Sequence, residues 1–271
     1  MANGPYCQTA YSRYGGYSGL KTAFKNDQES HAHSLRTLEA LFEYDDFMLS
    51  VQTLADMGCG SGLDLEWWAT RTTRDEQQMP LNIRCTGVDV NETLHMAQRY
   101  SNISFARADF ESALITKSKF DVIWCHDSFQ YAINPLQTLA NWHGILNDDG
   151  MLVLILPQTT NIVNNKQEFV QLDQTFYHWT LVNLIHALAL SGFDCRDGFF
   201  QKNRNDPWLH AVIYKSQHQP MDPKTTTWYE LCEKKLLPAS GETGVFRHGF
   251  LRQEDLVLPW LDKTLESFKD H

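Results

Sequence analysis

The chain has 271 residues, of which 42% are hydrophobic and 21% charged, and this composition is that of a folded protein rather than a disordered chain. Its length is enough to bury a large core in one domain with an additional segment. The formal net charge of −10 argues against binding to nucleic acid, because contact with the phosphate backbone needs clustered Lys and Arg.

Targeting signals and membrane-spanning segments are not visible in the sequence. Residues 1–17 lack the apolar stretch of a signal peptide, and no uncharged apolar run reaches the roughly 18 residues of a membrane helix. The six cysteines form no C-x-x-C pair and lie at no zinc-ligand spacing from a His, so we interpret them as reduced thiols. We therefore expect a soluble, cytoplasmic protein with no membrane partner.

The N-terminus is rich in Gly and Tyr. We interpret Tyr11, Tyr14 and Tyr17 as substrate-contacting residues of a lid, because amphipathic rings suit the mouth of a half-wet pocket. The alternative is a floppy terminus.

A helical pattern follows over residues 20–44, where Leu35, Leu38, Leu41 and Phe42 recur at spacings of three and four. His31 and His33 lie two apart and would point in different directions on a helix. We interpret them as solvated or lid residues rather than as a metal pair.

The most informative stretch is Asp56-Met57-Gly58-Cys59-Gly60-Ser61-Gly62, which has an apolar lead-in and is followed by a helical pattern over 63–69. A strand, a glycine turn and a helix N-terminus form a corner that suits a nucleotide, because glycines let a ligand approach the backbone and the helix end leaves N–H groups unpaired. The dinucleotide fingerprint G-x-G-x-x-G would place its third glycine at Leu63, so the spacing argues against a nicotinamide cofactor. The pattern D-x-G-x-G-x-G instead resembles the first motif of class I S-adenosylmethionine-dependent methyltransferases.

Apolar stretches at 83–90, 103–110, 120–125 and 151–156 predict further strands, with helical patterns from about Asn91 and over 136–146, the latter ended by residues 147–150. A helix over 176–190, ended by Ser191-Gly192, and strands over 193–201 and 209–215 complete the pattern. Strands that alternate with helices imply right-handed crossovers and a parallel sheet. Over about residues 51–216 the order resembles the family's doubly wound α/β fold, a mostly parallel seven-stranded sheet whose last strand is antiparallel.

The chain thus divides into an N-terminal lid and helix at 1–48, an S-adenosylmethionine-binding methyltransferase domain at 49–216 and a C-terminal helical extension at 217–271. The extension would cap the active site or form an arm of a homodimer, and the sequence does not choose between these roles. Its Arg247 and His248 stand between aromatic residues, and we interpret them as substrate residues, the alternative being a loop packed on the core.

The resemblance implies S-adenosyl-L-methionine as the cofactor, bound outside the carboxyl ends of the strands. Asp89 resembles the family's ribose-binding acid and Asp109 the acceptor for the adenine amino group, with Phe110 beside it; the alternative for both acids is a helix N-cap. Asp56 would orient the glycine turn or hold the cofactor amine through water. The predicted cofactor residues are Asp56, Gly58, Cys59, Gly60, Gly62, Asp89, Val90, Asp109, Phe110 and His126.

His126-Asp127-Ser128 follows the fourth strand, where a methyl acceptor would lie, and lacks the Asn/Asp-Pro-Pro-aromatic signature of relatives that methylate nucleic acid amines or glutamine. We therefore select His126 and Asp127 as catalytic candidates. His126 would act as a base, or it would lend its backbone carbonyl to the cofactor's ammonium group. Asp127 as a metal ligand lacks partner carboxylates, so we expect no metal.

The predicted function is transfer of a methyl group to a small-molecule O, N or S nucleophile by in-line displacement, which depends on near-attack geometry. The alternatives are a tRNA- or protein-modifying methyltransferase and a non-catalytic S-adenosylmethionine-binding partner subunit.

Overall fold

The computed structural model describes residues 31, 32, 34, 35, 37–39, 41–43, 46–91, 99–112, 118–157, 177, 179–202 and 208–237. The predicted substrate residues Tyr11, Tyr14, Tyr17, Arg247 and His248 lie outside the described residues. So do the predicted helix that begins near Asn91 and the second helix of the extension.

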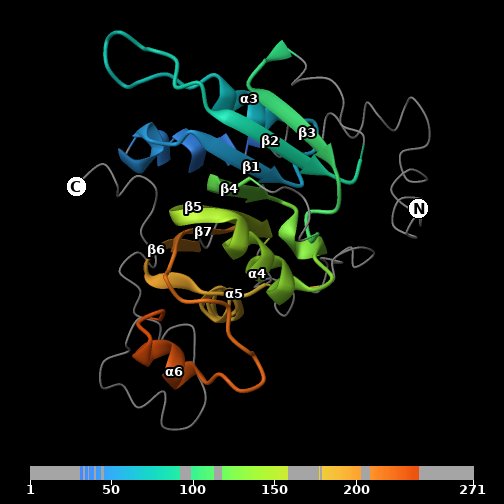
Figure 1. Ribbon diagram of the computed structural model, residues 1–271, viewed down its shortest axis with the longest axis vertical. Coiled ribbons are helices and arrows are strands. Elements are labelled where there is room, and N and C mark those ends of the chain that lie inside the picture. Colours follow the sequence, from blue (N-terminus) through green and yellow to red (C-terminus); the bar gives the residue numbers. More distant parts are fainter. Residues whose placement is uncertain are drawn as a thin grey trace, which may run out of the picture.

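A seven-stranded sheet in the order β3-β2-β1-β4-β5-β7-β6 forms the centre of the protein (Figure 1). The neighbours from β3 to β5 pair in parallel, whereas β7 is antiparallel to both β5 and β6. This arrangement confirms the predicted α/β fold and its antiparallel last strand. The strands are β1 Thr53–Met57, β2 Arg84–Asp89, β3 Ile103–Arg107, β4 Phe120–His126, β5 Leu146–Pro157, β6 Phe193–Lys202 and β7 Trp208–Lys215.

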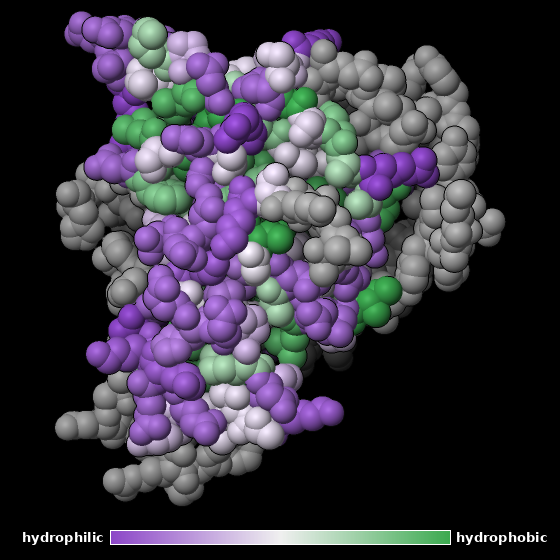
Figure 2. Space-filling view, viewed as in Figure 1, coloured by the Kyte–Doolittle hydropathy of each residue, from purple (hydrophilic) through white to green (hydrophobic). Residues whose placement is uncertain are grey.

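Helices cover both faces of the sheet. One core cluster contains the apolar faces of α4 and α5, and a second contains that of α3. Successive residues Leu54 and Ala55 of β1 belong to different clusters, as expected for a parallel strand buried on both sides. On the side shown in Figure 2 most described residues are hydrophilic, and apolar ones show in small groups. The helices are α3 Leu63–Ala69, α4 Pro135–Ile145, α5 Leu181–Leu190 and α6 Trp228–Glu233, with 3-10 turns η1 Asp46–Leu49 and η3 Phe129–Tyr131.

The described residues between 31 and 43 are helical, as predicted. Leu38 and Leu41 are buried in the cluster of α3, and Leu35 and Phe42 pack against it. The predicted apolar face is thus confirmed, and it packs on the body of the protein.

Two predicted boundaries were wrong. The helix expected from Phe176 begins at Leu181, because Thr180 and Asn183 form a capping box at its N-terminus. Residues 147–150, expected to be a turn that ends α4, belong to β5, whose register with β4 shifts between the pairs Phe120–Leu146 and Val122–Met151.

The first part of the extension packs on α5 and β6. Leu231, Leu236 and Leu237 are buried in the core cluster of α5, and the Cys195 N–H donates to the Leu236 carbonyl at 2.9 Å. The division of the chain at residues 48 and 216 stays a prediction. Among the described residues, no helix combines the length and apolar character needed to cross a membrane.

Candidate cofactor and acceptor site

The glycine turn after β1 has the backbone that its sequence predicts. Gly58, Gly60 and Gly62 all have positive φ, which other residues rarely adopt. The N–H groups of Gly58 and Cys59 donate to the Val88 carbonyl at 2.7 and 3.1 Å, so the turn is tied to the end of β2. A Cβ on Gly58 would lie 2.2 Å from Ser128 Oγ, and the turns after β1 and β4 are therefore in direct contact.

These turns enclose one side of a cavity of about 310 Å³, a volume within the range of small-molecule sites. The lining includes much of the predicted site together with residues that the sequence did not suggest. The predicted residues that line it are Asp56, Gly58, Cys59, Gly60, Asp89, His126 and Asp127, and the additional ones are His31, Ser61, Leu63, Asp64, Ser128 and Tyr131.

Asp89 closes the β2 side of the cavity. Its Oδ2 accepts from the Gly60 N–H at 3.0 Å and its Oδ1 from the Asn91 N–H at 2.7 Å. The second contact is local and of the kind that a capping residue makes. Asp89 therefore combines a cap-like contact with a place on the cavity wall.

The other predicted cofactor residues lie beside the cavity without lining it. Asp109 Oδ1 accepts from the Glu111 N–H at 2.9 Å, a local turn contact. The Phe110 carbonyl accepts from Trp142 Nε1 at 3.0 Å, and its ring edge lies 3.9 Å from the position of a Cβ on Gly58. Val90 is 44% exposed, and Gly62 is the N-cap residue of α3.

Asp56 is almost fully buried at the end of β1 and lines the cavity. Burial raises its pKa well above the ordinary value, and the nearby carboxylates of Asp64 and Asp89 raise it further. A cation in the cavity would favour its ionised form.

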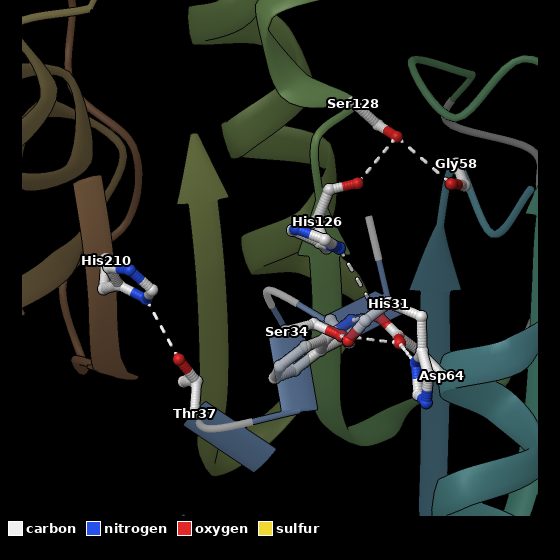
Figure 3. Close-up of polar contacts among 9 residues, drawn as sticks. His31, Ser34, Thr37, Gly58, Asp64, His126, Ser128 and His210 are labelled. Carbon is white, nitrogen blue, oxygen red and sulfur yellow. Dashed lines mark hydrogen bonds and ion pairs between the residues drawn. The ribbon is translucent and has the colours of Figure 1, made fainter. Parts of the chain in front are cut away.

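Asp64, in the first turn of α3, is the centre of a buried polar network (Figure 3). Its Oδ1 accepts hydrogen bonds from His31 Nδ1 and, at 2.7 Å, from Ser34 Oγ. Its Oδ2 accepts from Trp124 Nε1 at 2.8 Å and lies 3.7 Å from His126 Nδ1. Burial alone would raise the pKa of Asp64, but the interactions with His126, His31 and Ser34 outweigh it and hold this pKa below its usual range.

The interpretation of His31 as a solvated or lid residue was therefore wrong, because its ring is bonded to Asp64. The contact joins residues 33 positions apart, and no periodic pattern marks such a pair.

His126 lies at the end of β4 with its side chain 6% exposed and its ring 5.4 Å from that of Trp208. Its Nδ1 faces Asp64, and its Nε2 is buried with no hydrogen-bond partner in the described part of the chain. Its carbonyl already accepts from Ser128 Oγ at 3.0 Å, and the same hydroxyl lies 3.1 Å from the Gly58 carbonyl.

Asp127 follows with a φ of 49°, which is uncommon outside glycine and occurs often at functional sites. Its Oδ1 accepts from Gln130 Nε2 at 2.6 Å. The described residues contain no cluster of three or more His, Cys, Asp or Glu side chains that would hold a metal ion.

Several solved structures share this fold. The first is 1,6-didemethyltoxoflavin-N1-methyltransferase from Burkholderia thailandensis with 1,6-didemethyltoxoflavin and S-adenosylhomocysteine bound, at 17% identity and a TM-score of 0.54, covering 80% of this chain and 92% of that one. The plantazolicin methyltransferase BpumL in complex with S-adenosylhomocysteine is 18% identical, with a TM-score of 0.54 and coverage of 77% and 94%. A Haloferax volcanii methyltransferase in complex with the Trm112 activator is 17% identical, with a TM-score of 0.53 and coverage of 72% and 94%.

No curated protein matches the chain significantly. Residues 55–154, which run from β1 into β5 and contain the glycine turn, Asp89 and His126, match the methyltransferase domain family. This match covers 100 of the 271 residues, and together with the seven-stranded sheet it supports a class I methyltransferase domain that uses S-adenosylmethionine.

Proposed function

We propose that the chain methylates a small, neutral or cationic acceptor whose nucleophilic N, O or S atom carries a proton, and that His126 removes this proton. The observation that carries the proposal is the charge of the cavity wall. Four carboxyl groups line it, those of Asp56, Asp64, Asp89 and Asp127, and none of the described lining residues is Lys or Arg. An anionic acceptor or a nucleic acid would meet an unfavourable potential there.

The residues present fit the cofactor. Gly58 and Gly60 line the cavity with positive φ and without a side chain, so a ligand can approach the backbone of the turn closely. Asp89 would accept hydrogen bonds from the ribose hydroxyls, and Asp56 would face the ammonium group of the amino acid portion. When bound, S-adenosylmethionine supplies the methyl group: the acceptor atom bonds to the methyl carbon, and the carbon–sulfur bond breaks with its electron pair left on sulfur.

The residues of the chain orient the acceptor and the cofactor, and they provide a group that accepts the proton. With a proton on Nδ1 facing Asp64, the Nε2 of His126 has a lone pair, and this atom would take the proton that the acceptor loses. General base catalysis of this kind contributes about 10²- to 10⁴-fold to a rate. His126→Gln should therefore lower kcat by a factor in this range and leave the affinity for S-adenosylhomocysteine nearly unchanged.

Transfer of a labelled methyl group from S-adenosylmethionine to a panel of acceptors tests the proposal. The panel contains amines, phenols and thiols, matched carboxylates, total RNA and a protein extract. We expect product with neutral or cationic small molecules. Transfer confined to RNA or to protein would contradict the proposal. Binding of S-adenosylhomocysteine in calorimetry without transfer to any acceptor, including whole-cell extract, would support a non-catalytic partner subunit instead.

The lid residues Tyr11, Tyr14 and Tyr17, the substrate residues Arg247 and His248, the homodimer arm and the cytoplasmic location stay predictions. None of them is needed for the proposed chemistry.

A further inference from the structure

We infer that Asp64 is a positioning residue for His126, and that it links this histidine to the N-terminal helical segment through His31 and Ser34. The inference rests on the proposed role of His126 as the base. According to this inference, the Asp64 carboxylate determines which ring nitrogen of His126 carries the proton and how the ring is oriented.

The contacts of the Asp64 carboxylate come from two directions. His31 and Ser34 bind Oδ1 from the N-terminal segment, whereas Trp124 and His126 face Oδ2 from β4. An ionised carboxylate offers about four acceptor positions, and His31, Ser34 and Trp124 use three of them with hydrogen bonds while the fourth group, His126, lies farther away. A carboxylate held in this way cannot rotate away from His126 without losing several hydrogen bonds.

Trp124 gives the arrangement its rigidity. Its indole is fully buried in the second core cluster, where it packs edge-on against Trp68 at 6.0 Å. Its Nε1 donates to Asp64 at 2.8 Å from a ring that cannot turn. The carboxylate is therefore fixed by the core and not by solvent-exposed groups.

The position of the carboxylate decides the tautomer of His126. A negative oxygen opposite Nδ1 favours a proton on Nδ1 and leaves the lone pair on Nε2. The distance of 3.7 Å between Nδ1 and Oδ2 is longer than a hydrogen bond, and such contacts often tighten only when the ligands are bound. Once Nε2 takes a proton, the same carboxylate stabilises the imidazolium.

The N-terminal segment reaches both sides of His126. His31 and Ser34 contact α3, and Thr37 Oγ1 lies 3.0 Å from His210 Nδ1 on β7, the strand that also supplies the Trp208 ring packed on His126 (Figure 3). Leu38 and Leu41 anchor the segment in the core. Displacement of this segment would remove the two contacts at Oδ1 of Asp64 and leave the carboxylate held by Trp124 alone.

The charge environment of His126 is dominated by Asp64. His210 lies on β7, two strands away from His126. The other titratable residues that line the cavity are Asp56, Cys59, Asp89, Asp127, Tyr131 and His31. Among the described residues, Asp64 is the carboxylate that lies within 4.0 Å of a ring nitrogen of His126, at 3.7 Å.

The test is Asp64→Asn in the full chain, compared with Glu66→Gln. Glu66 is a matched control, because it lies on the same helix and its carboxylate accepts from Tyr100 at 2.7 Å rather than facing the cavity. For Asp64→Asn we expect kcat to fall about 10- to 100-fold and the pH profile of the rate to change, because the carboxylate opposite His126 is lost. The affinity for S-adenosylhomocysteine should change less than about threefold. Glu66→Gln should leave all of these readouts unchanged.

A measurement that needs no acceptor tests the same inference. Nitrogen-15 NMR of histidine-labelled protein, with the His126 signals identified by their loss in His126→Gln, should show the proton on Nδ1. Asp64→Asn should shift the equilibrium toward the Nε2–H tautomer, and His31→Gln should shift it in the same direction by less. If Asp64→Asn does not fold, the tautomer of His126 in His31→Gln, which keeps Asp64, tests the inference.

The inference is overturned if the variants of Asp64 and His31 leave the tautomer of His126, kcat and the pH profile as in the original chain, whatever they do to the melting temperature. If that result is obtained and His126→Gln is inactive, the proposed function still holds and only the inference about Asp64 fails. An active His126→Gln would instead contradict the role of His126 as base.

Discussion

The half of the sheet formed by β3, β2, β1 and β4 differs from the half formed by β5, β7 and β6 in where its polar residues lie. At the carboxyl ends of β1, β2 and β4, the residues Asp56, Asp89 and His126 bring buried or half-buried polar groups together around a cavity. In β5 the run Met151–Leu156 is buried at every position, and its neighbour β7 is buried over Leu209–Ile213. The difference teaches that both halves contribute to the apolar core, and that only the first also brings polar groups together at the ends of its strands.

Local backbone follows the same division. The half that holds the cavity has positive φ at Gly58 and Gly60 and at the non-glycine Asp127, the kind of conformation that a fold tolerates where function requires it. The other half has a capping box at Thr180 and a positive-φ Gly192 after α5, and its positive-φ non-glycine residues Asp149 and Lys235 do not line the cavity. Changes in one half should therefore affect stability, and changes in the other should affect binding.

The largest expected effect lies in the scaffold half. Leu188→Ala removes a fully buried side chain of α5 and should lower the free energy of unfolding by about 2–5 kcal/mol. Denaturant titration measures this loss, and calorimetry at a temperature where the variant is folded should give an unchanged affinity for S-adenosylhomocysteine. A parallel loss of affinity would show that the two halves are not separable.

The next effect lies in the half that holds the cavity. Asp89→Ala removes a charged acceptor from the cavity wall and should weaken binding of S-adenosylhomocysteine by about 1.5–3 kcal/mol, with the fold retained.

Asp121 provides the matched control for Asp89. It lies near the amino end of β4, where its carboxylate accepts from the Gln52 and Thr53 N–H groups, each at 2.9 Å. Asp121→Ala should lower the melting temperature and leave the affinity unchanged. If Asp89→Ala behaves in the same way, Asp89 acts as a capping residue.

A smaller effect sharpens the comparison from the scaffold side. Thr180→Ala removes the hydroxyl of the capping box and should cost about 1 kcal/mol of stability. The melting curve measures it, and kcat and KM should not change. An altered KM would mean that the start of α5 also shapes the site.

The smallest effect concerns pH. The pKa of Asp56 is raised in the folded state, so the folded protein binds this proton more tightly than the unfolded chain does. Stability should therefore decline as the pH rises from the ordinary aspartate pKa toward the raised one, and Asp56→Asn should lack this part of the decline.

Asp64 should behave in the opposite way. Because its pKa is lowered on folding, it contributes stability above the ordinary aspartate pKa and loses it as the pH falls through the folded value. Melting temperatures across a pH series, without cofactor, should rise for Asp56→Asn and fall for Asp64→Asn at neutral pH. The same sign for both variants would contradict these assignments.

The fold was accessible from the sequence because its signals are local. The glycine spacing predicted the turn, and apolar runs predicted all seven strands to within a few residues. The start of α5 was missed because aromatic residues before Thr180 continue the apolar pattern, while the capping box that begins the helix is a weaker signal. The network around Asp64 was missed for a different reason: it joins His31, Asp64 and His126, and such long-range contacts leave no periodic trace.

The contact between the turns after β1 and β4 restricts which sequences can share this geometry. A Cβ on Gly58 would lie 2.2 Å from Ser128 Oγ and 2.4 Å from its Cβ, so the gap between the two backbones holds one side chain at most. Position 128 accepts a side chain because position 58 has none. In homologous chains with the same turn, the two positions should covary, with glycine at one of them. The left-handed φ at position 58 makes that the favoured place for it.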